Sequence, residues 1–310
     1  MSQEITLCLL PTWRLSYRSW LTLSIAACIF GKKPYNSSMK FAGFAKRAFT
    51  LSGKGLVFLA VGLLALGWLL NTPPGLLGKA DAVGYAVCHR IDARSFHLGV
   101  RQLPMCVRCS GMYLGALTGL IYQAVTARRK GGMPGWIGVI FIGLFVAAFG
   151  VDGLNSYLHL FPGSPGLYEP QNWMRLVTGS GMGLVVSTLI FPAFNQTVWK
   201  NWSTAPALPG LRAWLVQLLL VAFVDILVFT ENPLILYPMA VLSALTVLFI
   251  LTMVYTMVWL MILRAENRYQ RFSELILPLT GGFGTALLQI VALDFARFLF
   301  TGTWDGFHLG

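Results

Sequence analysis

The sequence predicts an all-α protein, a polytopic transmembrane helical bundle of about seven spans. Hydrophobic residues make up 56% of the 310 residues and charged residues only 11%. Soluble domains carry about 25% charged residues, so this chain has too few charges to cover a water-exposed surface. Apolar runs recur along it at the length of about 20 residues that a helix needs to cross a bilayer. Runs this long and continuous favour helices over barrel strands.

Seven such runs can be read from the chain, and each is a candidate transmembrane helix. The sixth is long enough to tilt or to begin outside the lipid. The predicted spans are residues 55–73, 110–127, 135–157, 173–194, 212–230, 236–263 and 274–300.

The first 38 residues do not fit this pattern. The apolar run at 20–30 is too short to span a bilayer, and no small-residue cleavage site follows it. Met39 begins a basic stretch typical of the start of a membrane protein. We therefore expect residues 1–38 to be a misassigned leader and Met39 to be the working start, so that Cys8 and Cys28 play no part.

The Lys and Arg residues of the connections predict the orientation. The connections at 127–132, 200–212 and 264–271 are basic, whereas 158–172, 231–232 and 301–310 contain no Lys or Arg. Positive loops stay in the cytoplasm, so the N-terminus is predicted inside and the C-terminus outside a cell (inner) membrane. The basic residues behind the net charge of +12 lie in short clusters between the apolar runs. They form no basic groove with stacking aromatics, which argues against a nucleic-acid partner.

The segment 74–109, called the box below, breaks this charge rule. It lies on the predicted non-cytoplasmic face, yet it carries five basic residues and three of the five cysteines. Basic residues on the outer face are expected to bind something rather than to set topology. The five are Lys79, Arg90, Arg94, Arg101 and Arg108.

Cys106 and Cys109 form a C-x-x-C motif just before the second predicted span. A helix N-terminus favours an anion, so we expect both thiols to have a lowered pKa, with Arg108 adding to the effect. Either Cys109 or Ser110 is expected to cap the helix.

Three interpretations of the cysteines are open. Cys88, Cys106 and Cys109, with His89 (or His97) as the fourth ligand, could hold zinc or another thiophilic metal tetrahedrally. Alternatively, Cys106 and Cys109 could cycle between thiol and disulfide and pass electrons to a quinone. In the third interpretation Cys88 forms a structural disulfide with one of the pair, and the last thiol is idle.

Charged residues inside the predicted spans are costly and need a partner or a cavity. Asp152 and Arg175 lie near the outer ends of their spans, on the side of the box. We expect Arg94, Arg108 and Arg175 to bind an anionic group, from a lipid or a small molecule, and Asp152 to act as a base or to orient Arg175. Structural ion pairs, Asp152 with Arg175 and Asp294 with Arg297, are the alternative.

Glycines recur at every fourth residue on two predicted spans. Small residues at this spacing let transmembrane helices approach closely, so the second and fourth spans are expected to touch. The glycines are Gly111, Gly115 and Gly119 on the second span and Gly179 and Gly183 on the fourth.

The box and two downstream segments resemble a family of bacterial and archaeal predicted membrane proteins catalogued as a domain of unknown function. The pattern reads Cys-His, Arg-Ser-Phe and Leu-Pro-x-Cys-x-Arg-Cys-x-Gly-x-Tyr-x-Gly, then Asp-Gly and Asn-x-x-Arg-x-x-Thr-Gly. The matching box residues are Cys88, His89, Arg94, Ser95, Phe96, Leu103, Pro104, Cys106, Arg108, Cys109, Gly111, Tyr113 and Gly115. Downstream, Asp152, Gly153, Asn172, Arg175, Thr178 and Gly179 match. The resemblance covers residues 80–185 and implies no activity.

These observations predict a box-containing membrane domain at 39–194 with four spans and an additional three-span region at 195–310. The expected function is that of a metal-dependent membrane enzyme or electron-transfer protein with an outward-facing Cys/His site. The alternatives are a membrane thiol-disulfide/quinone oxidoreductase and a non-enzymatic transporter or assembly factor. The sequence predicts no oligomeric state.

Overall fold

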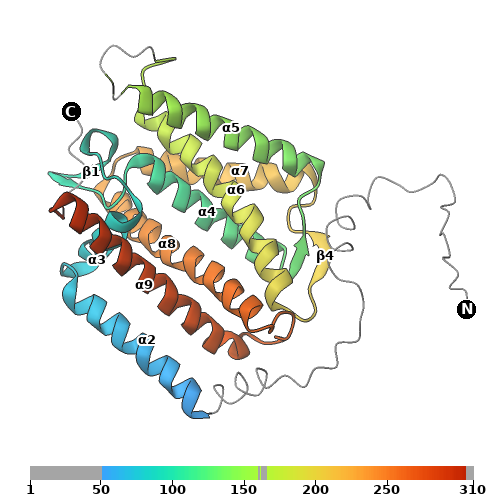
Figure 1. Cartoon of the computed structure of the whole chain (residues 1–310). Helices are drawn as coiled ribbons and strands as arrows, with labels where there is room; N and C mark the ends of the chain where they lie inside the picture. The colour runs from blue at the N-terminus through green and yellow to red at the C-terminus, as the bar shows by residue number, and fades with distance from the viewer. Residues whose placement is uncertain (1–50, 160, 162–165, 305–310) are drawn as a thin grey trace, which may run out of the picture. The chain divides into compact units, whose positions relative to one another are not determined.

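The computed structural model describes residues 51–159, 161 and 166–304, so the predictions for residues 1–38 and for Met39 lie outside the described residues. The described chain is an all-α helical bundle, as predicted (Figure 1). Its long helices are α2 (Leu51–Asn71), α4 (Val107–Thr126), α5 (Trp136–Leu158), α6 (Asn172–Val198), α7 (Gly210–Phe229), α8 (Pro233–Ile262) and α9 (Ile276–Thr301). The box adds the short helix α3 (Gly75–Val87), which was not predicted.

Six of the described helices are long and apolar enough to span a membrane, one fewer than the sequence predicted. The six segments are 53–71, 136–158, 172–198, 210–229, 233–262 and 272–301. The predicted span that is missing from the six is the second, 110–127, which corresponds to α4, a helix of 20 residues that is less apolar than the others. The reason is its position: α4 packs against α6, α7 and α8, so little of it needs to face lipid (Figure 1).

The contact between α4 and α6 is the most extensive in the bundle, and glycines lie along it. A Cβ atom at Gly115 would lie 2.4 Å from the carbonyl oxygen of Ser180, and one at Gly183 would lie 2.1 Å from that of Met112. No side chain fits at such distances, so the two backbones can approach this closely only with glycine. Gly111 and Gly179 meet backbone oxygens of the other helix in the same way, whereas a Cβ atom at Gly119 would meet the Ser187 side chain of α6.

The basic connections meet at one end of the bundle, called the basic end below. Strand β3 (Lys130–Gly132) pairs in parallel with β4 (Ser203–Pro206). The backbone N–H of Lys200 donates to the carbonyl of Tyr269 at 2.9 Å, and Arg129 donates to that of Gln270 at 2.5 Å. The three loops that the charge pattern assigns to the cytoplasm therefore form one surface.

The box lies at the opposite end, called the box end below (Figure 1). After α3 it forms a 3₁₀ turn (Asp92–Arg94) and a two-stranded hairpin, β1 (His97–Leu98) and β2 (Arg101–Gln102). Arg94 donates to the carbonyl of Ser156 at the end of α5, and the Tyr85 hydroxyl donates to that of Thr303 after α9. The box is thus held against the ends of α5 and α9.

Candidate functional site: a thiol cluster beside an arginine and aspartate network

The three cysteines of the box come together at the start of α4. Their Sγ atoms all lie within 4.8 Å of one another. Cys88 is buried, Cys106 and Cys109 are partly buried, and all three are free thiols. Cys106 is the N-cap of α4 and Cys109 lies three residues on, so both point from the same face of its first turn toward Cys88.

Backbone N–H groups surround the sulfur of Cys88. The N–H of Cys106 donates to this Sγ at 3.3 Å and that of Arg90 at 3.5 Å. Arg90 has a φ of 52°, a left-handed conformation that is uncommon for a residue with a side chain. The strained turn directs the Arg90 N–H to the sulfur, an arrangement that stabilises a thiolate.

The acidity of the thiols differs from the sequence prediction. Hydrogen bonds from Cys106 and Cys109 hold the pKa of Cys88 well below its usual range, in spite of its burial. For Cys106, the hydrogen bond with Cys109 acts to lower the pKa, but the hydrogen bond with Cys88 and burial outweigh it and raise the pKa to about 11. Hydrogen bonds with Cys106 and Cys88, and then burial, likewise raise the pKa of Cys109. The prediction of a lowered pKa at Cys106 and Cys109 is therefore wrong, because Cys88 takes the negative charge of the cluster.

The predicted cap is wrong as well. The helix begins at Val107, earlier than the predicted span, and no side chain of its N-cap residue bonds to the first turn. The Ser110 hydroxyl donates back to the carbonyl of Met105 at 3.4 Å.

The geometry of the cluster is compatible with a thiophilic metal. Zn–S bonds of 2.3 Å in a tetrahedral site place neighbouring sulfurs about 3.8 Å apart, so the thiols need to move together by less than about 1 Å. The cluster supplies three ligands. Among the described residues, neither candidate histidine belongs to the group of ligand atoms within 4.8 Å. His89 is exposed, and the His97 ring contacts Asp92 at 2.9 Å.

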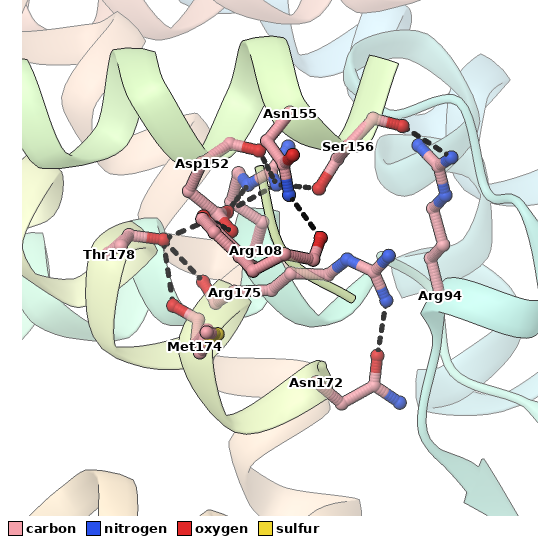
Figure 2. A network of polar contacts seen from close by, with 10 residues as sticks. Arg94, Arg108, Asp152, Asn155, Ser156, Asn172, Met174, Arg175 and Thr178 are labelled. Carbon is pink, nitrogen blue, oxygen red and sulfur yellow. Dashed lines mark hydrogen bonds and ion pairs between the residues drawn. The ribbon is translucent and has the colours of Figure 1, made fainter. Parts of the chain in front are cut away.

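Next to the thiols lies a polar network centred on Asp152, which is only 1% exposed (Figure 2). Arg108, in the first turn of α4, donates to the Asp152 Oδ2 atom through Nε at 2.9 Å and also through Nη2. Thr178 donates to the same oxygen at 3.2 Å, and Tyr168 donates to Oδ1 at 2.9 Å. Both carboxylate oxygens are therefore engaged, and the partner of Asp152 is Arg108 rather than Arg175.

Tyr168 and Thr178 also face an apolar pocket of about 410 Å³ between α5 and α6. Its other walls come from apolar residues such as Val151 and Val177. Burial, and then the hydrogen bond to Asp152, raise the pKa of Tyr168. The two hydroxyl groups thus separate the charged network from the apolar pocket.

Arg94 and Arg175 complete the network. Arg175 is only 7% exposed, and it donates to the Asn172 side chain at 2.8 Å. Its Nε atom has no hydrogen-bond partner. Burial, and then the charge of Arg108, lower the pKa of Arg94. Arg94 and Arg108 both donate to Ser156, and Arg108 lies between Cys106 and Cys109 at the start of α4, so the thiol cluster and the arginines adjoin.

The remaining charges within the spans are bound separately. Ser180 donates to Asp225 at 2.6 Å across α6 and α7. In the described part of the chain Asp294 and Arg297 do not form an ion pair with each other. Arg297 instead donates to the carbonyls of Tyr85 at 2.6 Å and Cys88 at 2.5 Å, so it ties α9 to the loop that carries the buried thiol.

Several residues of this site were not predicted from the sequence. Tyr168 lies in a connection without periodicity and gave no signal. Ser156, which accepts from Arg108 at 2.8 Å, lies one helical turn after Asp152, so helical spacing could have identified it. The role of Arg297 as a donor to box carbonyls depends on contacts between segments far apart in the sequence.

Comparisons with known proteins place this site in a family. Residues 88–189 match the family described as a predicted membrane protein (DUF2085). An uncharacterized protein of Methanocaldococcus jannaschii is 31% identical over 123 residues, 39% of this chain and 72% of that protein. An uncharacterized protein of Methanothermobacter thermautotrophicus is 30% identical over 106 residues, 34% of this chain and 86% of that protein. No solved structure matches. The chain therefore belongs to the DUF2085 family of predicted membrane proteins.

Proposed function

We propose that the protein is a metal-dependent membrane protein in which Cys88, Cys106 and Cys109 hold zinc or another thiophilic metal ion. The observation that carries this proposal is the approach of the three Sγ atoms to within 4.8 Å of one another. Soft thiolate ligands select such metals over magnesium or calcium. Zinc sites with three protein ligands keep a fourth position for water or substrate.

Two further features support a metal rather than a chance cluster. The N–H groups of Cys106 and Arg90 both donate to the Cys88 sulfur, which favours a thiolate. Arg297 fixes the same loop through its carbonyl groups. Contacts of this kind around the ligands orient a metal site, and their loss typically weakens binding 10- to 100-fold.

The second part of the proposal concerns the arginines. Arg94, Arg108 and Arg175 bind an anionic group beside the metal, and Asp152 holds Arg108 in position. A zinc ion with an open position supplies Lewis acidity and lowers the pKa of a bound water. The guanidinium groups orient the anion. His89 is the candidate for a fourth protein ligand: its ring in the cluster would close the site and make the metal structural, and without it the fourth position stays open.

The proposal includes a location. The basic end carries the Lys and Arg residues of three connections, and the rule for positive loops assigns that end to the cytoplasm. The box end then faces the other side of a cell (inner) membrane. The three-span region after residue 194 would form part of the same bundle as the box-containing domain.

Metal analysis of the protein purified in detergent, without chelators, tests the proposal. We expect about one equivalent of metal per chain and its loss in Cys106→Ser. His97→Ala is the matched control and should keep the metal, because the His97 ring contacts Asp92 instead. His89→Ala should lower the affinity if His89 is the fourth ligand.

The same experiment addresses the alternative, a membrane thiol-disulfide/quinone oxidoreductase. Cys88 lies within reach of both other thiols, and such an arrangement also permits disulfide exchange. Metal-free protein with a reducible disulfide between Cys106 and Cys109 would contradict the metal centre and support the redox function. Metal-free protein with three inert thiols would contradict both and favour a transporter or an assembly factor.

A further inference from the structure

The arginine network has more positive charge than it has partners. It contains the guanidinium groups of Arg94, Arg108 and Arg175, and Asp152 is the carboxylate that contacts it. Asp152 is bound by Arg108 through two nitrogen atoms. Among the described residues, no carboxylate contacts the guanidinium groups of Arg94 and Arg175. Burial makes such charges costly unless an anion joins them.

Most of the N–H groups of Arg94 and Arg175 are unused by the described protein. A guanidinium has five N–H donors. Arg94 donates to one carbonyl, that of Ser156 at 2.8 Å, and Arg175 donates to one side-chain oxygen, that of Asn172. The buried Nε atom of Arg175 has no partner at all. Figure 2 shows the Arg175 side chain extending away from Thr178 toward Arg94.

Two helix N-termini add to the positive potential of this region. Helices α4 and α6 both begin at the box end, and the side chains of Cys106 and Gln171, their N-cap residues, accept no hydrogen bond from a backbone N–H of the first turn. The two helices are in direct contact there, because a Cβ atom at Gly179 would lie 2.2 Å from the carbonyl oxygen of Arg108. The first turns of long helices carry free N–H groups and favour anions.

We propose that Arg94 and Arg175, with Arg108 behind them, bind a doubly charged tetrahedral oxyanion of the phosphate-monoester class. This inference rests on the anion-binding part of the proposed function and names its ligand. A carboxylate brings one negative charge on two oxygens, and one arginine balances that charge. A phosphate monoester brings close to two charges and at least three acceptor oxygens, which matches both the uncompensated charge and the donors of two separate guanidinium groups.

Arg108 places this ligand next to the thiol cluster. It lies between Cys106 and Cys109 at the start of α4, and both Arg108 and Arg94 donate to Ser156. A phosphate group held by these arginines therefore lies at the boundary between the thiols and the network. The phosphate can belong to a soluble molecule or to a lipid such as phosphatidic acid, and both sources present the same chemistry.

Binding measurements on the full chain in detergent or nanodiscs test the proposal. Inorganic phosphate is the soluble probe, acetate is the carboxylate probe, and nanodiscs with phosphatidic acid in phosphatidylcholine are the lipid probe. We expect phosphate or phosphatidic acid to bind at least about tenfold more tightly than acetate or pure phosphatidylcholine, with an affinity that falls as salt rises. Binding of phosphate alone identifies a soluble source, and binding of phosphatidic acid alone identifies a lipid source.

Variants connect the binding to the site. Arg175→Gln should weaken it at least about tenfold, and Arg175→Lys, which keeps the charge but loses the fork of donors, should weaken it less. Arg101→Gln is the matched control from the same box, because Arg101 contacts Asp81 at 2.6 Å. Should Arg175→Gln fail to fold, Arg94→Gln gives the same test.

The outcomes separate this inference from the metal centre. Arg175→Gln should keep its metal, and Cys106→Ser should lose it. Acetate binding as tightly as phosphate, unchanged binding in folded Arg175 and Arg94 variants, or no binding of either phosphate probe would overturn the inference. None of these results would alter the metal content on which the proposed function depends.

Discussion

At the scale of single residues, the site depends on how Asp152 is satisfied. Its two oxygens accept from a guanidinium and two hydroxyl groups at a position that is almost fully buried. The carboxylate is thus saturated with donors, which suits a residue that positions Arg108. The sequence interpretation of Asp152 as a base stays a prediction, and one that would require this network to open.

Asp152→Asn should strongly destabilise the protein, because it leaves the Arg108 guanidinium buried without its counter-charge. Removing one member of a buried ion pair typically costs about 3–5 kcal/mol. Asp92→Asn is the matched control: Asp92 contacts His97 at 2.9 Å and its side chain is 80% exposed, and contacts of this kind at the surface contribute about 1 kcal/mol or less. Unfolding in denaturant, in the same detergent, measures both. Equal effects of the two substitutions would contradict this account of Asp152.

At the scale of helices, the contact between α4 and α6 positions the site. It brings Arg108 in the first turn of α4 to Gly179 of α6, one turn after Arg175. Without glycines the two backbones could not approach, and the cysteines and arginines would separate. The packing of these helices is therefore a condition for the site.

Gly183→Ala should disrupt this contact. Its Cβ would lie 2.1 Å from the carbonyl oxygen of Met112 and 2.5 Å from the backbone nitrogen of Ala116, and neither atom can move without shifting α4. Overpacking of this kind typically costs about 1–3 kcal/mol. Gly143→Ala, on α5, meets nothing within 4 Å and should be neutral or slightly stabilising. Thermal unfolding would detect the difference, and equal melting temperatures would contradict the predicted overlap.

A second prediction at this scale concerns polar side chains between helices. Gln217 on α7 has no exposed surface, and both polar atoms of its side chain lack a partner. The Gln289 side chain on α9 accepts from the Tyr255 hydroxyl at 2.8 Å. Gln217→Leu should therefore leave stability unchanged or raise it, whereas Gln289→Leu should lower it by about 1 kcal/mol because Tyr255 loses its partner. A lowered melting temperature in Gln217→Leu would show that its amide is bonded in the membrane.

At the scale of the whole bundle, the connections sort into two ends. The basic loops pair with one another through β3, β4 and backbone hydrogen bonds, while the box binds the ends of α5 and α9. This separation is the structural basis for the proposed orientation.

Single cysteine substitutions can measure that orientation. Val100→Cys, at the fully exposed tip of the β1–β2 hairpin, should react with a membrane-impermeant maleimide in intact cells. Thr204→Cys, exposed at the basic end, should react only in inverted vesicles. The unsubstituted protein corrects for its native thiols. The reverse pattern would place the box in the cytoplasm and contradict the proposed orientation.

Properties that depend on local sequence could be predicted, whereas properties that depend on contacts between distant segments could not. Hydropathy and charge are local, so the helical fold class, the positions of the long helices and the alternation of basic and non-basic loops could be read from the chain. The cap of α4 and the pKa of Cys106 could not, because both depend on neighbours brought in by folding. The less apolar composition of α4 is explained by the helices that pack around it, and this packing could not be read from the sequence.

The chain alone was sufficient to establish a membrane protein with its cysteines and arginines gathered in one segment, because composition and spacing carry that information. Which charges meet required the packed bundle. Asp152 accepts from Arg108 and not from Arg175, and Arg297 reaches the Cys88 loop and not Asp294, because the approach of helices in three dimensions decides which guanidinium comes within hydrogen-bond distance.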